Sequence, residues 1–189
     1  MITEKQKMLK GLLYDAGDTE LSLKREKARR LLYSLNITDY GNKCRYTEII
    51  RELFPNSQSD IWIEPPFYCD YGYNIYAAEK VFFNYNCVIL DVMPVKIGNN
   101  TMFGPNVQIY TATHPLNCLE RKKGLESAKP ISIGDDCWIG GGVIICPGVT
   151  IGSRTVIGAG SVVTRNICDD VFAAGNPCKV IKEGINIKS

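Results

Sequence analysis

The stretch IGDDCWIGGGVIICPGVTIGSRTVIGAGSVVTRNIC, residues 133–168, repeats its pattern every six residues. An aliphatic β-branched residue opens each unit, at Ile133, Ile139, Ile145, Ile151, Ile157 and Val163. The fifth position of each unit is small or β-branched, at Cys137, Val143, Val149, Thr155, Ser161 and Ile167. A period of six is neither helical nor the alternation of one continuous strand. It suits a short strand followed by a turn in which Gly or Asn supplies the backbone geometry.

A looser copy of this period precedes the regular stretch. Its units open at Ala77, Phe83 and Ile89 and, after a two-residue insertion, at Ile97, Phe103 and Ile109. Three units of six residues make a triangular coil of about 18 residues, and stacked coils hydrogen-bond at the usual strand spacing of about 4.8 Å. The sequence therefore predicts a mainly β fold, a parallel β-helix whose interior is a ladder of Ile and Val side chains.

The limits of the repeats predict how the chain is organised. Residues 77–114 and 133–168 give two coils each, and residues 63–76 give a degenerate first coil. The segment between the regular coils is polar and bounded by Gly and Pro, so we expect a loop extruded from the solenoid, either covering a site or merely tolerated. The expected parts are an N-terminal helical segment (1–58), the β-helix (59–168) with its loop (115–132), and a C-terminal tail (169–189).

The N-terminal segment is predicted to be helical, because leucines and charged residues recur there at helical spacing. Thr3 and Gln6 are typical of a capping box at the start of a first helix. Asp18 or Thr19 is a candidate cap for a second helix. These signals predict a small helical cap before the solenoid.

A third, shorter helix is expected after Thr47. It would end at Pro55, because proline interrupts helical hydrogen bonding. The charge run KREKARR in the second helix is interpreted as a solvated helix face rather than a binding patch, since acidic neighbours partly balance it.

Composition and charge exclude several classes of protein. The 189 residues include 22 Lys and Arg against 20 Asp and Glu, a net charge of +2, which disfavours a charge-driven nucleic-acid role. No apolar run is long enough for a transmembrane helix, and the N-terminus has no secretory signal. Eight cysteines without a CxxC pair fit free thiols better than disulfides or a zinc ribbon. We therefore expect a cytoplasmic protein that binds neither nucleic acid nor membrane.

His114 is the only histidine in the chain. One imidazole cannot build a multi-histidine zinc site, so no metal is expected. Histidine titrates near neutral pH, which makes His114 the one imidazole available for acid–base chemistry. By its position alone, a single His at the end of a strand more often has a structural role.

Six segments together resemble the hexapeptide-repeat sugar O-acetyltransferases, especially the maltose and galactoside acetyltransferases. They are YCDYGYNI (68–75), VILDV (88–92), IYTATHP (109–115), CWIGGGVIICPGVTIG (137–152), VIGAGSVVT (156–164) and AAGNPCKVI (173–181). The helical N-terminus is similar to that of the maltose branch. The resemblance implies a left-handed parallel β-helix, a homotrimer with active sites between subunits, and acetyl transfer from acetyl-CoA to a sugar hydroxyl.

The same resemblance implies two catalytic residues. His114 matches the family's general base, which takes the hydroxyl proton as the sugar oxygen attacks the thioester. Asn84 matches a position that contacts both acceptor and acetyl-CoA, where it could orient the hydroxyl or donate a hydrogen bond to the developing oxyanion. The structural alternative for Asn84 is a corner of the solenoid.

Three carboxylates are candidates for binding the acceptor sugar. Asp15 and Asp70 match sugar-contacting positions, although a helix cap or a turn is the structural alternative for each. Where the galactoside branch has an acidic sugar contact, this chain has Val92, and Asp91 beside it is a candidate contact. That departure weakens the expectation that galactosides are the preferred acceptor.

Residues that match the coenzyme path lie in the second half of the chain. They are Gly141, Ala159, Thr164, Arg165, Lys179 and Lys182. Trp138, which is expected to point outward, is a further candidate to line the coenzyme groove. Small residues would let the pantetheine arm lie against the coil wall, and the two lysines would meet the phosphates as point charges. For the two lysines, the alternative is an ordinary solvated basic tail. For Trp138, the alternative is packing in a trimer interface.

Direct transfer in a ternary complex is favoured over an acetyl-cysteine intermediate. Cys87 and Cys137 fall on fifth positions of the repeat, where small apolar side chains fill the interior. Other acceptors (serine, an amino sugar or an antibiotic) and a non-catalytic trimeric scaffold are the alternatives to sugar acetylation. A lyase of the γ-carbonic anhydrase type would require three histidines. The helical N-terminus with Asp15 favours the sugar branch, and which sugar is the acceptor stays open.

Overall fold

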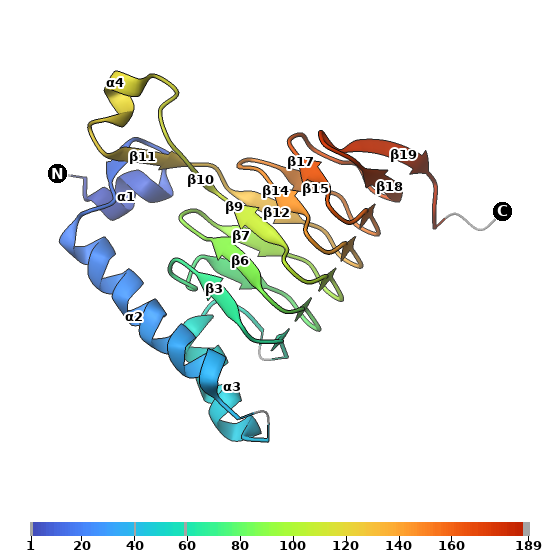
Figure 1. The fold of residues 1–189 in the computed structure, drawn as a ribbon, viewed down its shortest axis with the longest axis horizontal. Coiled ribbons are helices and arrows are strands. Elements are labelled where there is room, and N and C mark those ends of the chain that lie inside the picture. Colours follow the sequence, from blue (N-terminus) through green and yellow to red (C-terminus); the bar gives the residue numbers. More distant parts are fainter. Residues whose placement is uncertain (1, 40, 59, 187–189) are drawn as a thin grey trace.

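The computed structural model describes residues 2–39, 41–58 and 60–186. Its body is a parallel-stranded solenoid of about six turns, with helices at the N-terminal end and a β-hairpin at the C-terminal end (Figure 1). The predicted fold class, a mainly β solenoid with an N-terminal helical segment, is confirmed. Among the described helices, none combines the length and apolarity required to cross a bilayer.

The solenoid has three faces, each a sheet of parallel strands that follow one another in chain order. The first face contains β2 (Trp62–Ile63), β5 (Phe82–Phe83), β8 (Met102–Phe103), β13 (Trp138–Ile139), β16 (Val156–Ile157) and β18 (Val171–Ala174). The second face contains β3 (Phe67–Cys69), β6 (Cys87–Leu90), β9 (Gln108–Tyr110), β14 (Ile144–Ile145) and β17 (Val162–Val163). The third face contains β4 (Ile75–Ala77), β7 (Val95–Ile97), β12 (Ile131–Ile133) and β15 (Thr150–Ile151).

The period of six sets the register of these faces. Ile139 pairs with Ile157 of the next coil and with Phe103 of the preceding one, so the opening residues of the units stack inward. Their side chains are almost completely buried, and each contributes about 1.5–3 kcal/mol by leaving water. Cys87 and Cys137 are each 1% exposed, as expected for residues that fill the interior. Burial raises the pKa of the Cys87 thiol to about 11.

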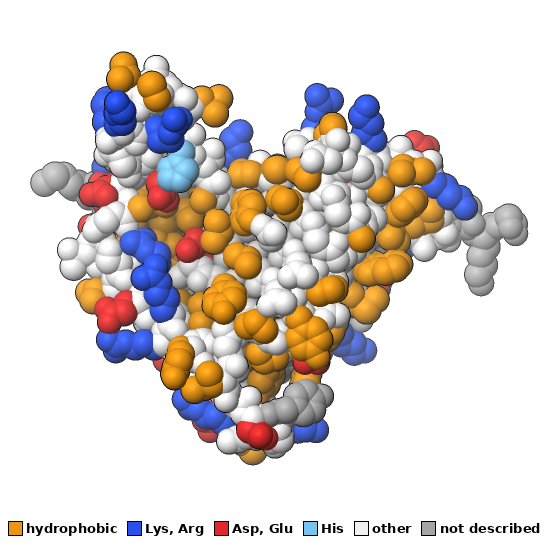
Figure 2. Space-filling view, in the orientation of Figure 1, with side chains coloured by type: hydrophobic (Ala, Val, Ile, Leu, Met, Phe, Trp, Pro, Cys, Tyr) orange, Lys and Arg blue, Asp and Glu red, His pale blue; other side chains and the backbone are white. Residues whose placement is uncertain are grey.

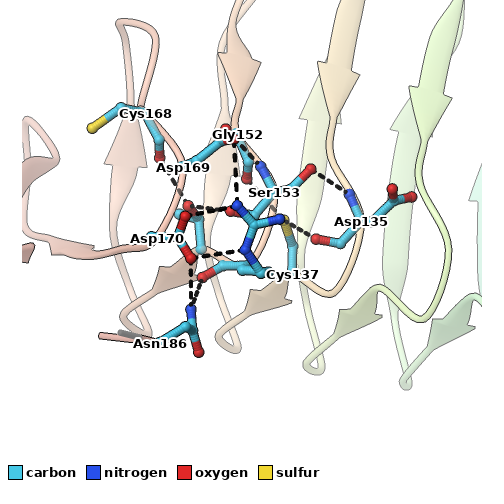
Figure 3. Close-up of polar contacts among 10 residues, drawn as sticks. Asp135, Cys137, Gly152, Ser153, Cys168, Asp169, Asp170 and Asn186 are labelled. Atoms are coloured by element: carbon cyan, nitrogen blue, oxygen red, sulfur yellow. Dashed lines mark hydrogen bonds and ion pairs between the residues drawn. The ribbon is translucent and has the colours of Figure 1, made fainter. Parts of the chain in front are cut away.

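A ladder of polar side chains holds one corner of the solenoid (Figure 3). Ser153 Oγ accepts a hydrogen bond from the Asp135 N–H at 3.1 Å, and Asp169 Oδ1 accepts one from the Ser153 N–H at 3.0 Å. Arg154 donates from Nε and Nη2 to the two carboxylate oxygens of Asp170 at 2.8 and 2.7 Å. Arg154 and Asp170 adopt φ of +56° and +58°, the left-handed conformation that the turn requires. Local side-chain bonds therefore satisfy backbone groups where the chain turns.

Three helices precede the solenoid: α1 (Glu4–Leu9), α2 (Thr19–Ile37) and α3 (Lys43–Leu53). The Thr3–Gln6 capping box is present, and Asp18 caps α2 by accepting from the Leu21 N–H, as predicted. The prediction that the third helix begins after Thr47 is wrong. Asn42 caps it through a hydrogen bond from the Arg45 N–H, so the helix begins at Lys43.

Helices α2 and α3 close the N-terminal end of the solenoid with apolar side chains. Ile49, Leu53 and Phe54 are at most 3% exposed and belong to the same buried cluster as the coil interior. The Phe54 ring meets Phe67 edge-on at 5.8 Å between centroids, which continues the packing into the first coil. The cap thus covers interior surface that an open coil would expose to water.

The extruded segment is more ordered than the expected loop. It contains α4 (Cys118–Arg121) and β11 (Leu125–Ala128), and β11 lies between β1 (Tyr14–Asp15) and β10 (Ala112–Thr113) in an antiparallel sheet. The solenoid resumes at Ile131, two residues earlier than expected, because β12 pairs with β7 from that residue. The tail likewise begins as solenoid, because β18 pairs in parallel with β16.

Candidate active site

The small antiparallel sheet positions His114 at the edge of the solenoid. Thr113, the last residue of β10, lies opposite Ser127 of β11, and His114 follows it directly. The other edge of β11 pairs with β1, where Tyr14 lies opposite Glu126. His114 is exposed, so its imidazole is accessible to a ligand.

A pocket of about 330 Å³ lies where this sheet, helix α2 and the solenoid meet. Its lining residues are Tyr14, Ala16, Arg25, Arg29, Asp70, Tyr71, Leu90, Val92, Ala112, His114 and Glu126. Figure 2 shows the region as a hollow beside the single pale-blue histidine, with acidic side chains at its rim and basic ones beside it. The pocket combines hydrogen-bond donors, hydrogen-bond acceptors and an apolar floor, an arrangement suited to a small polar ligand.

Asp70 brings a carboxylate to the pocket directly after β3. Burial raises the pKa of its carboxyl, and the charge of Glu126 adds to this, while Arg25 and Arg29 act in the opposite direction. The structure therefore places Asp70 and His114, two of the predicted site residues, in one pocket.

Arg25 ties three parts of the pocket wall together. Its Nη1 donates to the Tyr71 hydroxyl at 2.7 Å, and its Nη2 donates to the Ala16 carbonyl at 2.5 Å. The guanidinium also lies 5.7 Å from the centroid of the Tyr71 ring. These contacts fix helix α2 against both the β1–α2 connection and the solenoid.

Asp91 lies behind the pocket rather than in it, and the expectation that it contacts the acceptor is corrected. The side chain is 0% exposed, and its Oδ1 accepts hydrogen bonds from the N–H groups of Asp70 and Tyr71 at 3.0 and 2.8 Å. Its Oδ2 accepts from the Asn74 N–H at 3.3 Å. Burial raises the pKa of the Asp91 carboxyl to about 7, and the charge of Asp70 adds to this, while the hydrogen bonds from the N–H groups of Tyr71 and Asn74 act in the opposite direction. Asp91 thus supports the backbone that carries Asp70.

Asp15 and Asn84 lie outside the residues that line this pocket. Asp15 is exposed, and its Oδ1 accepts from the Gly17 N–H at 2.7 Å within the turn that precedes α2. Asn84 follows β5 at a corner of the solenoid, where its Oδ1 accepts from the Tyr85 N–H at 2.8 Å. Both residues therefore have the structural roles that the sequence left open, and an acceptor could still reach the exposed Asp15.

The residues expected along the coenzyme path lie on the first face and beyond its corner. Trp138 points outward from β13 and is 55% exposed. Gly141 and Ala159 occupy the corner that follows this face in successive coils, where the Gly160 N–H donates to the Gly141 carbonyl at 2.9 Å. Thr164 and Arg165 are exposed after β17, at the next corner. None of these residues lines the pocket that contains His114.

A β-bulge brings the two predicted phosphate-binding lysines to one face. Strand β19 (Lys179–Glu183) pairs antiparallel with β18, and the register shifts so that Lys179 and Lys182 lie opposite Ala174 and Phe172. Because Ala174 and Phe172 are two residues apart on β18, they point to the same side of the sheet, and so do the lysines opposite them. Without the bulge, Lys179 and Lys182 would point to opposite sides, since they are three residues apart.

Two known families match the chain. The bacterial transferase hexapeptide (six repeats) matches residues 130–165, and the maltose acetyltransferase hexapeptide capping motif matches residues 7–57. A Dictyostelium discoideum protein named as an acetyltransferase is 49% identical over 188 residues, covering 100% of this chain and 97% of that protein. The chain belongs to the hexapeptide-repeat sugar O-acetyltransferase family.

Two solved structures of this family resemble the chain along nearly its whole length. Maltose O-acetyltransferase from Clostridium difficile 630 has a TM-score of 0.93 and 49% identity, covering 96% of this chain and 97% of that one. Galactoside acetyltransferase in complex with coenzyme A has a TM-score of 0.92 and 36% identity, covering 97% of this chain and 92% of that one. The similarity thus includes the helical cap as well as the repeats.

In this hexapeptide-repeat acetyltransferase, the capping motif contributes directly to the pocket. Tyr14, Arg25 and Arg29 lie within the matched residues 7–57 and line the pocket beside His114. The cap therefore has two roles: it covers the end of the solenoid and it provides one wall of the candidate active site.

Sequence reasoning missed Tyr14, Arg25 and Glu126. Arg25 belongs to a charge run that was interpreted as a solvated face, and only its hydrogen bonds reveal that this half-buried side chain joins α2 to the pocket wall. Glu126 lies in a segment without a repeat, and its position depends on pairing with β1, more than 100 residues away in the chain. No local signal marks a residue that a distant strand brings into place.

Proposed function

We propose that the chain transfers an acetyl group from acetyl-CoA to a hydroxyl of a sugar, either maltose or glucose or a galactoside, with His114 as the general base. The observation that carries this proposal is the placement of the only imidazole at a pocket that also contains carboxylates and guanidinium groups. Sugar hydroxyls both donate and accept hydrogen bonds, so this mixture suits a neutral sugar.

The reaction proceeds by direct attack in a ternary complex. An imidazole nitrogen of His114 takes the hydroxyl proton as the sugar oxygen bonds to the thioester carbonyl carbon. The carbonyl oxygen becomes an oxyanion, to which Asn84 donates a hydrogen bond. As the C–S bond breaks, the proton passes from His114 to the sulfur, which leaves the O-acetyl sugar and the thiol of coenzyme A.

Acceptor binding relies on Asp70 within the pocket and Asp15 near it. Carboxylate oxygens accept hydrogen bonds from sugar hydroxyls, and the two residues come from the solenoid and the cap. Val92 lines the pocket where the galactoside branch has an acidic contact, which favours maltose or glucose over galactosides. Asp91 acts indirectly, by holding the backbone of Asp70.

The donor lies along the first face, its corner and the end of the second face. Trp138, Gly141, Ala159, Thr164 and Arg165 provide a path for the pantetheine arm, and Lys179 and Lys182 provide charge for the phosphates. Support comes from the common side of the two lysines and from the coenzyme A complex of the related galactoside acetyltransferase.

Among the described residues, no group of His, Cys, Asp and Glu is arranged to hold a metal ion.

The active enzyme is proposed to be a homotrimer with sites between subunits. Within one chain, Asn84 and the donor residues do not line the pocket that contains His114. Acetyl transfer requires acceptor, base and thioester within reach of one another. A second copy that presents its own first face to this pocket would complete the site.

The test measures release of the coenzyme A thiol from acetyl-CoA in the presence of single acceptors. We expect release with maltose or glucose, weaker release with galactosides, and an O-acetyl sugar as product. Serine, an amino sugar and an aminoglycoside antibiotic are the comparison acceptors. Faster release with one of these than with every sugar would contradict the proposal.

A further inference from the structure

Glu126 presents a carboxylate oxygen to the pocket beside His114. Its side chain lines the pocket, and its Oε2 accepts a hydrogen bond from the Tyr14 hydroxyl at 2.7 Å. Within the described part of the chain, its Oε1 accepts no hydrogen bond and the carboxylate forms no ion pair. The second oxygen is therefore free to accept a hydrogen bond from a ligand.

Tyr14 holds this carboxylate rigidly. Its ring is 1% exposed and packs in a buried cluster with Leu21, Tyr71 and Val92. Burial raises the pKa of the Tyr14 hydroxyl, and the hydrogen bond to Glu126 raises it further, so the phenol keeps its proton and remains a donor. The cross-strand pairing of Tyr14 with Glu126 fixes the backbone of both residues.

The charges of the lining residues indicate which donor Glu126 meets. Asp70 and Glu126 bring two negative charges, and Arg25 and Arg29 bring two positive charges. Because these charges balance, the pocket provides no net negative potential that would favour an ammonium group. A neutral hydroxyl is the donor that fits.

We propose that Glu126, positioned by Tyr14, is a specificity-determining residue that accepts a hydrogen bond from a second acceptor hydroxyl, not the one that is acetylated. The inference rests on the proposed sugar O-acetyltransferase function. It defines the acceptor class as neutral polyols with a free hydroxyl at this second position. Analogues that lack this hydroxyl leave the carboxylate without its partner and are poor acceptors.

The experiment compares glucose with its monodeoxy analogues in the wild type and in Glu126→Gln. The amide oxygen of the introduced glutamine would accept from Tyr14, so its NH₂ group would face the pocket as a donor instead of an acceptor. We expect the wild type to disfavour one deoxy analogue by about 10- to 100-fold in kcat/KM, the range for a hydrogen bond to a charged group. In Glu126→Gln, glucose falls to the level of that analogue, while the KM for acetyl-CoA is unchanged.

Two further variants keep the result interpretable. Glu120→Gln makes the same chemical change on the same extruded segment, outside the pocket, and should behave as the wild type. Tyr14→Phe removes only the hydroxyl that holds Glu126, and should reduce discrimination against the same deoxy analogue.

Separate outcomes identify which proposal fails. If the wild type acetylates glucose but Glu126→Gln and Tyr14→Phe keep its full discrimination among deoxy analogues, the role of Glu126 is wrong and the proposed function stands. If the wild type acetylates none of the sugars, the proposed function fails and this inference fails with it. A folded Glu126→Gln protein whose kcat/KM falls by the same factor with glucose and with that deoxy analogue would also contradict a role in acceptor choice.

Discussion

At the scale of single residues, burial decides what each polar side chain does. Asp91 is fully buried and accepts three backbone hydrogen bonds, so it organises the chain around Asp70. His114 is exposed at the end of a short strand, so it is available for chemistry. The sequence marked both residues as site candidates, but only the fold shows that Asp91 is buried behind the pocket while His114 lines it.

The raised pKa of Asp91 predicts a specific dependence of stability on pH. The group has a pKa of 3.8 when unfolded and about 7 when folded, so the folded state binds the proton more tightly. The stabilisation of the folded state that this group provides is complete below about pH 4 and is lost as the pH rises through about 7. The loss is on the order of a few kcal/mol, since each pKa unit corresponds to about 1.4 kcal/mol.

Urea unfolding of the wild type and Asp91→Asn between pH 4 and 8 measures this effect. The stability of the wild type relative to the variant should decline over that range, because the amide does not titrate. A constant difference between the two proteins would show that the Asp91 carboxyl has an ordinary pKa.

At the scale of elements, the period of six was sufficient to predict the solenoid. Inward-facing residues recur every six positions, and the three faces follow from stacking the units. The start of α3 was missed because the Asn42 cap depends on one local side-chain bond. The sheet formed by β1, β11 and β10 was missed because antiparallel pairing between distant segments leaves no periodic signal.

The bulged hairpin of β18 and β19 yields a prediction for the coenzyme. If Lys179 and Lys182 meet its phosphates from one face, replacing both with Ala should raise the KM for acetyl-CoA severalfold, since two charge-assisted contacts are lost. The KM for dephospho-acetyl-CoA, which lacks the 3′-phosphate, should change less. Steady-state kinetics with both donors checks this.

Lys122 and Lys123 provide the matched control. They are exposed on the extruded segment, outside the hairpin, and replacing both with Ala removes the same charge. Equal increases in KM for both donors, or an equal effect of this control pair, would contradict phosphate binding by β19.

At the scale of the whole molecule, the candidate active site is assembled from parts far apart in sequence. The cap supplies Tyr14 and the arginines, the first coils supply Asp70, the extruded segment supplies Glu126, and His114 lies immediately before that segment. The proposed donor residues lie outside this pocket, on later coils of the same solenoid. This separation is why we propose that neighbouring subunits complete the site, a feature that the repeat alone could not predict.

The decisive measurement is the rate of acetyl-CoA-dependent acetylation of maltose or glucose by His114→Ala. We predict a loss of at least about 100-fold in kcat, the usual contribution of a positioned general base, with coenzyme binding and assembly unchanged. Turnover of this variant near the wild-type rate would show that His114 does not activate the acceptor hydroxyl.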